Sequence, residues 1–271
     1  MRRLALSLAL LVSGCGAAHR APAPPQPIHG LYRAGDARLF LDCRGTGRRT
    51  VVLDSGLGVD STSTWSAVRP AVARFARVCQ YDRAGMGSSP PGPRPRTSGR
   101  MVAELRALLH SAGVRPPYVL VGASFGGLNV QLYASQHPRE VVGVVLVDGL
   151  HPDLDRRIEP ILGRRASAQR RAALGRNAER VRFADILASD AEVSAARRFP
   201  DVPLIALRHE VSFDPGGRPD PRVERLWAAL QRANAARSPR GRVLVAPGSH
   251  HRIAEDRPDI VIAAIRNVAS G

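Results

Sequence analysis

The sequence predicts an α/β fold in which a mostly parallel central sheet of about eight strands is covered by helices on both faces. Two observations support this prediction. From residue 38 onward, runs rich in β-branched and apolar residues alternate with segments of helical apolar spacing, which is typical of strand–helix–strand units. The chain has 271 residues, 44% of them hydrophobic, so it can bury one sizeable core and is too short for two ordinary enzyme domains.

Short apolar runs mark the expected strands, and helical spacing of apolar residues marks the helices between them. We expect strands near residue 31 and over residues 38–43, 50–54, 77–81, 118–122, 142–147, 203–207 and 242–246. The helices are expected over residues 65–76, 100–112, 127–136, 221–236 and 259–268.

The alternation of strands and helices is interrupted once, at about residues 150–202. This stretch has no strand pattern, is dense in Arg and Ala, and contains Pro160 and Pro200. We expect it to form a short helical cap insertion above the carboxyl ends of the strands, where a lid over a ligand would lie. A surface elaboration that is unrelated to substrate is the alternative.

The charge of the chain is strongly positive, with a formal net charge of +17. The chain has no Lys, and its Arg residues are scattered through almost every segment. Only 4% of its residues are aromatic. A nucleic-acid interface needs a basic stripe, commonly interleaved with aromatic residues. We therefore expect no nucleic-acid partner, and a basic surface-binding protein stays an alternative whose affinity for anionic polymers would fall steeply with salt.

The first residues have the features of an export signal. Arg2 and Arg3 precede an apolar run over residues 4–12, which is too short to span a bilayer. Ser13 and Gly14 stand directly before Cys15, an arrangement that resembles the lipobox of bacterial lipoproteins, in which the peptide is cut before a cysteine that receives the lipid.

These features predict the organisation of the chain before its folded domain. We expect residues 1–14 to be a signal peptide, residues 15–30 to hold the lipidated Cys15 and a proline-rich tether, and residues 31–271 to form the folded domain. The protein is then exported and held at the membrane of the cell envelope through Cys15. An ordinary secretory signal, giving a secreted or periplasmic protein, is the alternative.

The segment over residues 118–127 carries the motif with the clearest chemistry. It reads as an apolar strand, then Gly-Ala-Ser-Phe-Gly, then the start of a helix, which is the context of a nucleophile elbow. Ser124 would expose its Oγ above the sheet, while side chains at Gly122 or Gly126 would clash in so sharp a turn. A glycine-rich turn that merely caps a helix is the alternative. A serine hydroxyl needs a base, so a histidine must reach Ser124.

Four further segments, together with the elbow, carry a resemblance to a known family. They read Leu-Asp-Ser-Gly-Leu-Gly at residues 53–58, Tyr-Asp-Arg-Ala-Gly-Met-Gly-Ser at 81–88, Leu-Val-Asp at 146–148 and Gly-Ser-His-His at 248–251. In this order the chain resembles the single-domain α/β-hydrolases over about residues 38–268. The resemblance implies a serine esterase or lipase type of enzyme, because the relatives that hydrolyse epoxides or remove halides use Asp as nucleophile.

The resemblance assigns the base and the oxyanion donors. His251 follows the last strand and aligns with the base, and His250, which stands where the family usually has Gly, is the alternative. The backbone N–H groups of Phe125 and Leu57 align with the two donors that would stabilise an oxyanion. Residues 81–88 are expected to be a structural turn. The other histidines, such as His110, His137 and His209, are expected at the surface.

The acid that would orient His251 has two competing positions. The family most often places it after the strand expected at residues 203–207, but the expected position falls near Ser212, which is no carboxylate. Asp148 ends the preceding strand, where some relatives carry the acid, and we favour it over Asp214, with Glu210 third. An Asp that ends the strand for structural reasons is the alternative reading of Asp148.

The same fold would bring Cys43 and Cys79 onto neighbouring antiparallel strands. Outside the cytoplasm such a pair persists as a disulfide, and two buried free thiols are the alternative.

The function expected from these features is hydrolysis of a carboxylic ester or related acyl bond through an acyl-enzyme, with a small-molecule acyl substrate. The sequence shows no metal-ligand spacing and no phosphate-cradling glycine loop, so neither metal nor organic cofactor is expected. A non-catalytic ligand-binding lipoprotein with the same fold is the alternative.

Overall fold

Eight strands form one sheet in the computed structural model, in the spatial order β1-β2-β4-β3-β5-β6-β7-β8. They are β1 (Ile28–Ala34), β2 (Ala37–Arg44), β3 (Thr50–Asp54), β4 (Arg77–Asp82), β5 (Tyr118–Ala123), β6 (Val141–Val147), β7 (Leu204–His209) and β8 (Gly241–Ala246). The pairs β1–β2 and β2–β4 are antiparallel, and all others are parallel. The mostly parallel sheet predicted from the sequence is confirmed.

The structure describes residues 28–196, 198–213 and 219–270. The predicted signal peptide, Cys15, most of the proline-rich tether and Asp214 lie outside the described residues. The boundary expected between tether and domain at residue 31 is three residues late, because β1 already begins at Ile28 and pairs with Cys43 at that end. Among the helices described, none is long and apolar enough to cross a membrane.

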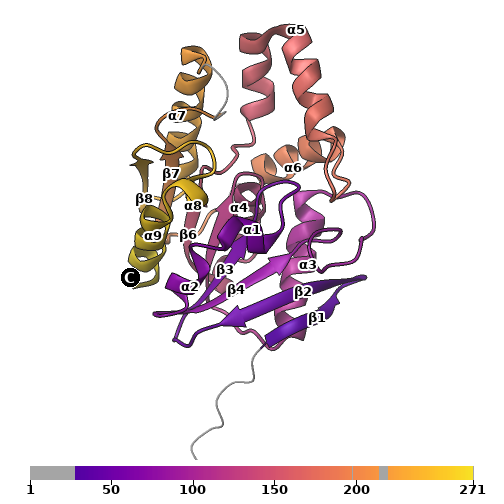
Figure 1. Cartoon of the computed structure of the whole chain (residues 1–271), viewed down its shortest axis with the longest axis vertical. Helices are drawn as coiled ribbons and strands as arrows, with labels where there is room; N and C mark the ends of the chain where they lie inside the picture. The colour runs from indigo at the N-terminus through magenta and orange to yellow at the C-terminus, as the bar shows by residue number, and fades with distance from the viewer. Residues whose placement is uncertain (1–27, 197, 214–218, 271) are drawn as a thin grey trace, which may run out of the picture.

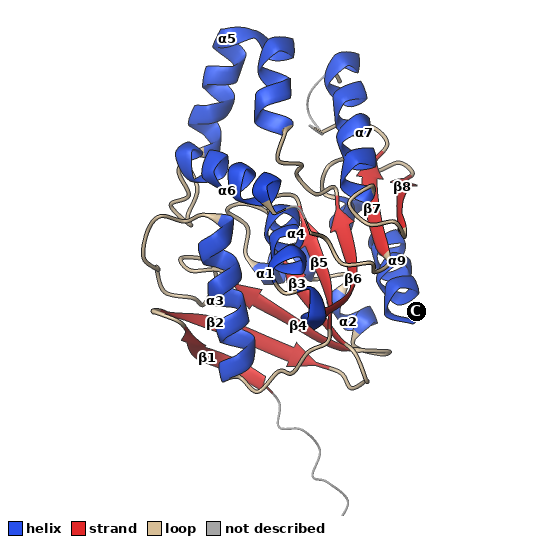
Figure 2. Ribbon diagram, turned by 180° about the vertical axis from the view of Figure 1, so that it is seen from behind, coloured by secondary structure: helices blue, strands red, loops and turns tan. Residues whose placement is uncertain are grey.

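Helices cover both faces of the sheet because alternate residues of the central strands point in opposite directions. Val52 faces α3 (Ser98–Ser111) and α4 (Gly126–Gln136), which Figure 2 shows in front of the sheet. Its neighbours Val51 and Leu53 belong to the opposite core. That core packs beneath α1 (Ser61–Trp65), α2 (Arg69–Val72) and α9 (Pro258–Ser270) (Figure 1). Helix α7 (Pro221–Ala235) packs on β7 and β8, and the short helix α8 (Ile253–Asp256) lies against α1 and α9.

The single helix predicted over residues 65–76 is wrong. In the structure α1 ends at Trp65, and a second short helix, α2, begins at Arg69 with Pro70 in its first turn. Proline has no N–H to donate to the preceding turn, so a helix running into Pro70 from residue 65 would lose a hydrogen bond. In the first turn of a new helix that N–H would have no partner within the helix, so proline is tolerated there.

The segment between β6 and β7 rises above the carboxyl ends of the strands (Figures 1 and 2). It holds α5 (Leu154–Leu174) and α6 (Phe183–Ala195). Gly163 interrupts α5 with φ 75° and ψ 166°, a conformation that glycine adopts without steric cost. The two limbs of α5 therefore fold back on each other as a hairpin. We call this hairpin and α6 together the cap.

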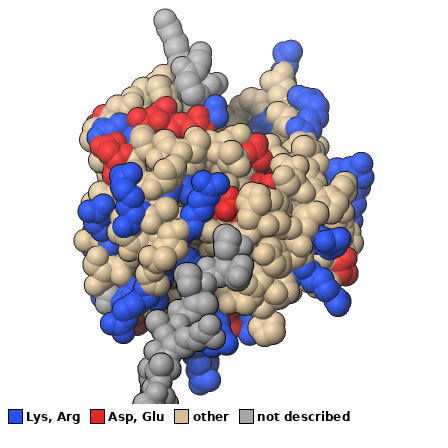
Figure 3. Space-filling model, turned by 60° about the horizontal axis from the view of Figure 1, so that its bottom comes forward, with Lys and Arg blue, Asp and Glu red and all other residues tan. Residues whose placement is uncertain are grey.

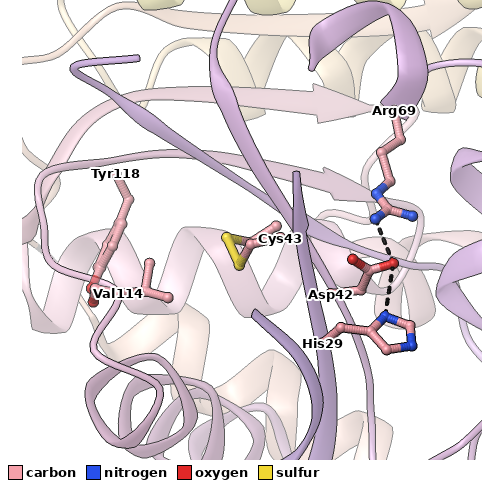
Figure 4. The surroundings of a disulfide bond; sticks show 7 residues. His29, Asp42, Cys43, Arg69, Val114 and Tyr118 are labelled. Atoms are coloured by element: carbon pink, nitrogen blue, oxygen red, sulfur yellow. Dashed lines mark hydrogen bonds and ion pairs between the residues drawn. A yellow bond between two sulfur atoms is a disulfide. The ribbon is translucent and has the colours of Figure 1, made fainter. Parts of the chain in front are cut away.

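The predicted disulfide joins Cys43 and Cys79. The two residues lie directly opposite each other in the antiparallel pair β2–β4, close to the Asp42–Arg69 ion pair (Figure 4). On the face of the molecule in Figure 3, basic side chains are scattered between neutral and acidic ones rather than gathered in one band.

Candidate active site

Ser124 lies at the sharp turn between β5 and α4. Its backbone has φ 49°, a left-handed conformation that costs a non-glycine residue free energy and is typical of functional turns. A Cβ atom at Gly126 would lie 2.5 Å from the carbonyl oxygen of Asp54, and one at Gly122 would overlap the carbonyl oxygen of Gly126. Both glycines are therefore required for this turn, as the sequence predicts.

The structure brings Ser124, His251 and Asp148 into one row of hydrogen bonds. Nε2 of His251 lies 2.9 Å from Oγ of Ser124, and Nδ1 of His251 lies 2.7 Å from Oδ2 of Asp148. His251 comes from the loop after β8, and Asp148 directly follows β6. The arrangement fits a serine nucleophile, a base and an acid that orients the base.

His250, the alternative base, and Glu210, an alternative acid, do not join this row of hydrogen bonds. The backbone N–H of His250 donates to Asp256, and the ring of His250 lies 3.5 Å from the same carboxylate. Glu210 accepts a hydrogen bond from the backbone of Gly248. Within the described part of the chain, Asp148 is the carboxylate that contacts His251.

Asp148 is completely buried and accepts four hydrogen bonds. Oδ1 accepts from the backbone N–H of His209 and from Nε1 of Trp227, while Oδ2 faces the ring nitrogens of His209 and His251. Burial alone would raise the pKa of Asp148, but the two histidines hold it below its usual value. Asp148 is therefore an anion with every acceptor position occupied.

His209 is a site residue that the sequence reasoning missed. The prediction that it lies at the surface is wrong, since it is 1% exposed. Its Nδ1 lies 2.6 Å from Asp148, and its Nε2 lies 2.8 Å from Glu224 of α7. His209 follows the strand expected at residues 203–207 and precedes the helix expected at residues 221–236. The sequence around it has no local pattern that signals such contacts.

The protons of His209 follow from its partners. Oε1 of Glu224 accepts the backbone N–H of Phe213, so both carboxylates that face the His209 ring act as acceptors. Both ring nitrogens then carry hydrogen, which makes His209 a cation. Burial would lower the pKa of His209, but the hydrogen bonds and charges of Asp148 and Glu224 raise it.

Leu57 and Phe125, whose backbone amides are the predicted oxyanion donors, both lie in the wall of the cavity beside Ser124. Leu57 lies in the loop after β3, and Phe125 is the residue after Ser124. Neither of these amides donates to an acceptor among the described residues. Unpaired donors at this place are what an oxyanion requires.

Arg83 fixes the loop that holds Leu57. It is 3% exposed and uses all five of its N–H donors. Two go to Glu179 at 2.6 and 2.7 Å, one goes to Asp54, and the remaining two go to the carbonyl oxygens of Ser55 and Gly56 at 2.7 and 2.6 Å. The turn over residues 81–88 therefore supplies a positioning side chain.

Glu179 connects this loop to the cap. It lies in the stretch between α5 and α6, its side chain is fully buried, and its Oε1 accepts the backbone N–H of Gly58 at 2.7 Å. Arg83 and Glu179 thus hold the backbone on both sides of Leu57.

Ser124 lies where two cavities meet. The larger, of about 480 Å³, extends under the cap and is mainly apolar, with walls from α5, α6 and α7 that include Leu154, Ile158, Leu162, Leu174, Ile186 and Trp227. The second, of about 350 Å³, reaches from Ser124 past His251 and has Arg176, Arg252 and Glu255 in its wall. Phe213 lines both and stacks on the His251 ring with centroids 4.1 Å apart.

One group of described residues has ligand atoms close enough to hold a metal ion, namely Asp148, His209 and His251. Their ring nitrogens already lie at hydrogen-bond distance from one carboxylate oxygen. An ion there would replace the hydrogen bonds that orient His251 toward Ser124.

Comparison with known proteins identifies the family. Residues 49–202, more than half of the chain, match the family described as alpha/beta hydrolase fold. The chain belongs to this family. An AB hydrolase superfamily protein of Gibberella zeae is 32% identical over 120 residues, which are 41% of this chain and 37% of that protein. This α/β-hydrolase spans less than half the length of the first curated relatives that it matches.

Solved structures of α/β-hydrolases share the fold with this chain. E-2-(acetamidomethylene)succinate hydrolase superposes with a TM-score of 0.64 at 19% identity, covering 91% of this chain and all of that one. The esterase RhEst1 from Rhodococcus sp. ECU1013 gives a TM-score of 0.62 at 19% identity over 90% of this chain and 99% of that one. At these identities the likeness establishes the architecture.

Proposed function

We propose that this α/β-hydrolase is a serine hydrolase that cleaves a carboxylic ester or related acyl bond through an acyl-enzyme. The observation that carries the proposal is the row of hydrogen bonds from Ser124 through His251 to the buried Asp148. The unpaired amides of Leu57 and Phe125 beside Ser124 support it, as does membership of the family.

In the proposed reaction, Oγ of Ser124 attacks the carbonyl carbon while its proton passes to Nε2 of His251. The resulting oxyanion accepts hydrogen bonds from Leu57 and Phe125, and Asp148 stabilises the His251 imidazolium. Collapse breaks the bond to the leaving group, which takes the proton from His251. Water then attacks the acyl-enzyme with His251 as base, which releases the acid and restores Ser124.

The two cavities suggest which part of the substrate lies where. The larger cavity is walled by aliphatic side chains of α5, α6 and α7, so burying an apolar acyl group there is favourable by roughly 25 cal/mol per Å². The second cavity, with its arginines and Glu255, suits the leaving group and water. We therefore propose an ester with an apolar acyl group as the substrate class.

The experiment is a rate comparison with p-nitrophenyl esters from acetate to palmitate. Activity that rises beyond acetate and disappears in Ser124→Ala supports the proposal. Asp148→Asn should lower kcat on the order of 10⁴-fold without unfolding the protein, while Asp214→Asn serves as the control and leaves the rate nearly unchanged. If the wild type and Ser124→Ala both hydrolyse the esters no faster than buffer alone, the result would favour a non-catalytic binding protein instead.

We also propose that the protein acts outside the cytoplasm, anchored through a lipid on Cys15. The Cys43–Cys79 disulfide supports this, because disulfides persist in oxidising compartments and are rare in reducing ones. The proposed partners are therefore a membrane, reached through the lipid, and a small-molecule acyl substrate.

A further inference from the structure

The wall of the larger cavity beside Ser124 contains an ion pair among its aliphatic side chains. In the proposed function this cavity holds the acyl group, and we call it the acyl cavity. Nη1 of Arg170 contacts Oδ1 of Asp155, and both residues line the cavity. The other cap residues in the wall are apolar, namely Leu154, Ile158, Leu162, Ala173, Leu174 and Ile186. Charged groups do not bind an apolar acyl group, so contact with substrate does not explain this ion pair.

The ion pair joins the two limbs of the α5 hairpin (Figures 1 and 2). Asp155 lies in the first turn of α5, before the interruption at Gly163, and Arg170 lies after it. Both side chains are largely withdrawn from solvent, at 7% exposure for Asp155 and 25% for Arg170. The pair therefore bridges the space between the two limbs.

An outer cavity lies on the other side of the ion pair. Its volume is about 290 Å³, and it shares Asp155, Ile158 and Arg170 with the acyl cavity. The rest of its wall comes from both limbs of α5 and from α6, namely Arg156, Glu159, Ser167, Arg171, Phe183 and Leu187. Residues that line two neighbouring cavities lie between them, so Asp155, Ile158 and Arg170 form a partition.

The outer cavity has apolar surface that could bind the end of a longer chain. Phe183 and Leu187 of α6 line it, and Leu187 is 46% exposed. Covering such an exposed apolar side chain with another apolar group is favourable. The partition, rather than a lack of apolar surface beyond it, therefore determines where an acyl chain must end.

Asp190 of α6 does not compete with Asp155 for Arg170. It is 8% exposed, and burial together with the charge of Asp155 raises its pKa to about 8. At pH 7 its carboxyl group is mostly protonated, so Asp155 is the anion that pairs with Arg170. Separating this pair would leave a largely buried charge without its partner, which is costly. The partition is therefore a stable part of the wall.

We propose that Asp155, Ile158 and Arg170 limit the length of the acyl chain that the enzyme accepts. The inference rests on the proposed function, and it assigns these residues a role in specificity rather than in the chemical step. Removing the ion pair should join the two cavities, so that longer chains are bound and hydrolysed. Each further methylene group that becomes buried should raise affinity about fourfold.

The test compares the wild type with Asp155→Ala/Arg170→Ala, which removes both charges together. Straight-chain fatty acids from hexanoate to palmitate are titrated into the purified proteins by calorimetry, and kcat/KM is measured with the matching p-nitrophenyl esters. In the wild type, affinity and kcat/KM should stop rising at one chain length. In the double variant this limit should move by about two carbons or more, which is roughly a tenfold gain for the first chains beyond the wild-type limit.

Glu159→Ala/Arg171→Ala is the matched control. This ion pair also joins the two limbs of α5, with 3.4 Å between Nη1 of Arg171 and Oε2 of Glu159, but neither residue lines the acyl cavity. The control should keep the wild-type limit. Ile158→Ala is a second test variant for the case that the double variant does not fold. It keeps the ion pair, thins the partition and should move the limit in the same direction.

Two results would overturn the partition. One is a limit that stays at the wild-type chain length, or no limit at all, in the folded test variants and the wild type. The other is an equal shift in the Glu159→Ala/Arg171→Ala control, which would mean that a loosened hairpin admits the longer chains. Fatty-acid binding needs no catalysis, so failure of the proposed hydrolase activity and failure of the partition are distinguishable.

Discussion

Replacing Glu179 by Gln tests whether the cap fixes the oxyanion loop. Glu179 is fully buried and accepts three hydrogen bonds, two from Arg83 and one from Gly58. Gln removes the charge and turns an amide N–H₂ toward one of these donors. Breaking a buried ion pair by removing one partner costs on the order of 3–5 kcal/mol of stability, so Glu179→Gln should lower the free energy of unfolding by about that amount.

The same substitution should also slow the reaction. Arg83 holds the carbonyl oxygens of Ser55 and Gly56, just before Leu57, so its misalignment moves one proposed oxyanion donor. Loss of one such donor lowers kcat by about 10²–10³-fold, and a displaced donor should lower it by roughly 10–100-fold with little change in KM.

Glu104→Gln is the matched control for this experiment. Glu104 pairs with Arg96, and both side chains are as buried as the Arg83–Glu179 pair. Among the described residues Glu104 makes no hydrogen bond with the loop at Leu57, so Glu104→Gln should lose comparable stability and keep its kcat. Urea unfolding and ester kinetics on both variants, at a temperature where both are folded, give the comparison. Equal kcat values for the two variants would refute the positioning role.

Three further predictions concern other parts of the molecule. Since its two carboxylate partners raise the pKa of His209 despite burial, the stability difference between wild type and His209→Gln in urea should be largest below pH ~6.5 and shrink as pH rises through the raised pKa; a difference that grows with pH contradicts the cation. Cys43→Ala/Cys79→Ala should lose about 3–4 kcal/mol in the same assay, and no loss would exclude a stabilising bond. Cys15→Ser in a bacterial host should move the protein from the membrane to the soluble fraction, and unchanged fractionation would remove the anchor.

The sheet and the elbow were predictable because their signals are local. The seven strands expected from residue 38 onward lie within two residues of the observed ones, since continuous apolar runs between turn residues are required of strands buried on both faces. Ser124 and its flanking glycines follow from the space available in one tight turn. The resemblance then supplied His251 and Asp148 by order along the chain.

The contacts that support the site were not predictable, because they join residues far apart in sequence. Arg83 and Glu179 are 96 residues apart, and His209 and Asp148 are 61 apart. No periodicity marks such pairs, and arginine is so frequent in this chain that Arg83 does not stand out. Histidine is intermediate in its tendency to be buried, so the sequence around His209 does not indicate that this side chain is buried.

The most direct measurement of the central claim is labelling with a fluorophosphonate, which reacts with an activated serine. After reaction and proteolysis, mass spectrometry should find the phosphonyl adduct on the peptide that contains Ser124. Labelling should be absent in Ser124→Ala and much slower in Asp148→Asn, because Asp148 orients His251 and His251 activates Ser124. An adduct on another residue, or labelling of Ser124→Ala at the wild-type rate, would contradict the assignment of Ser124 as the nucleophile.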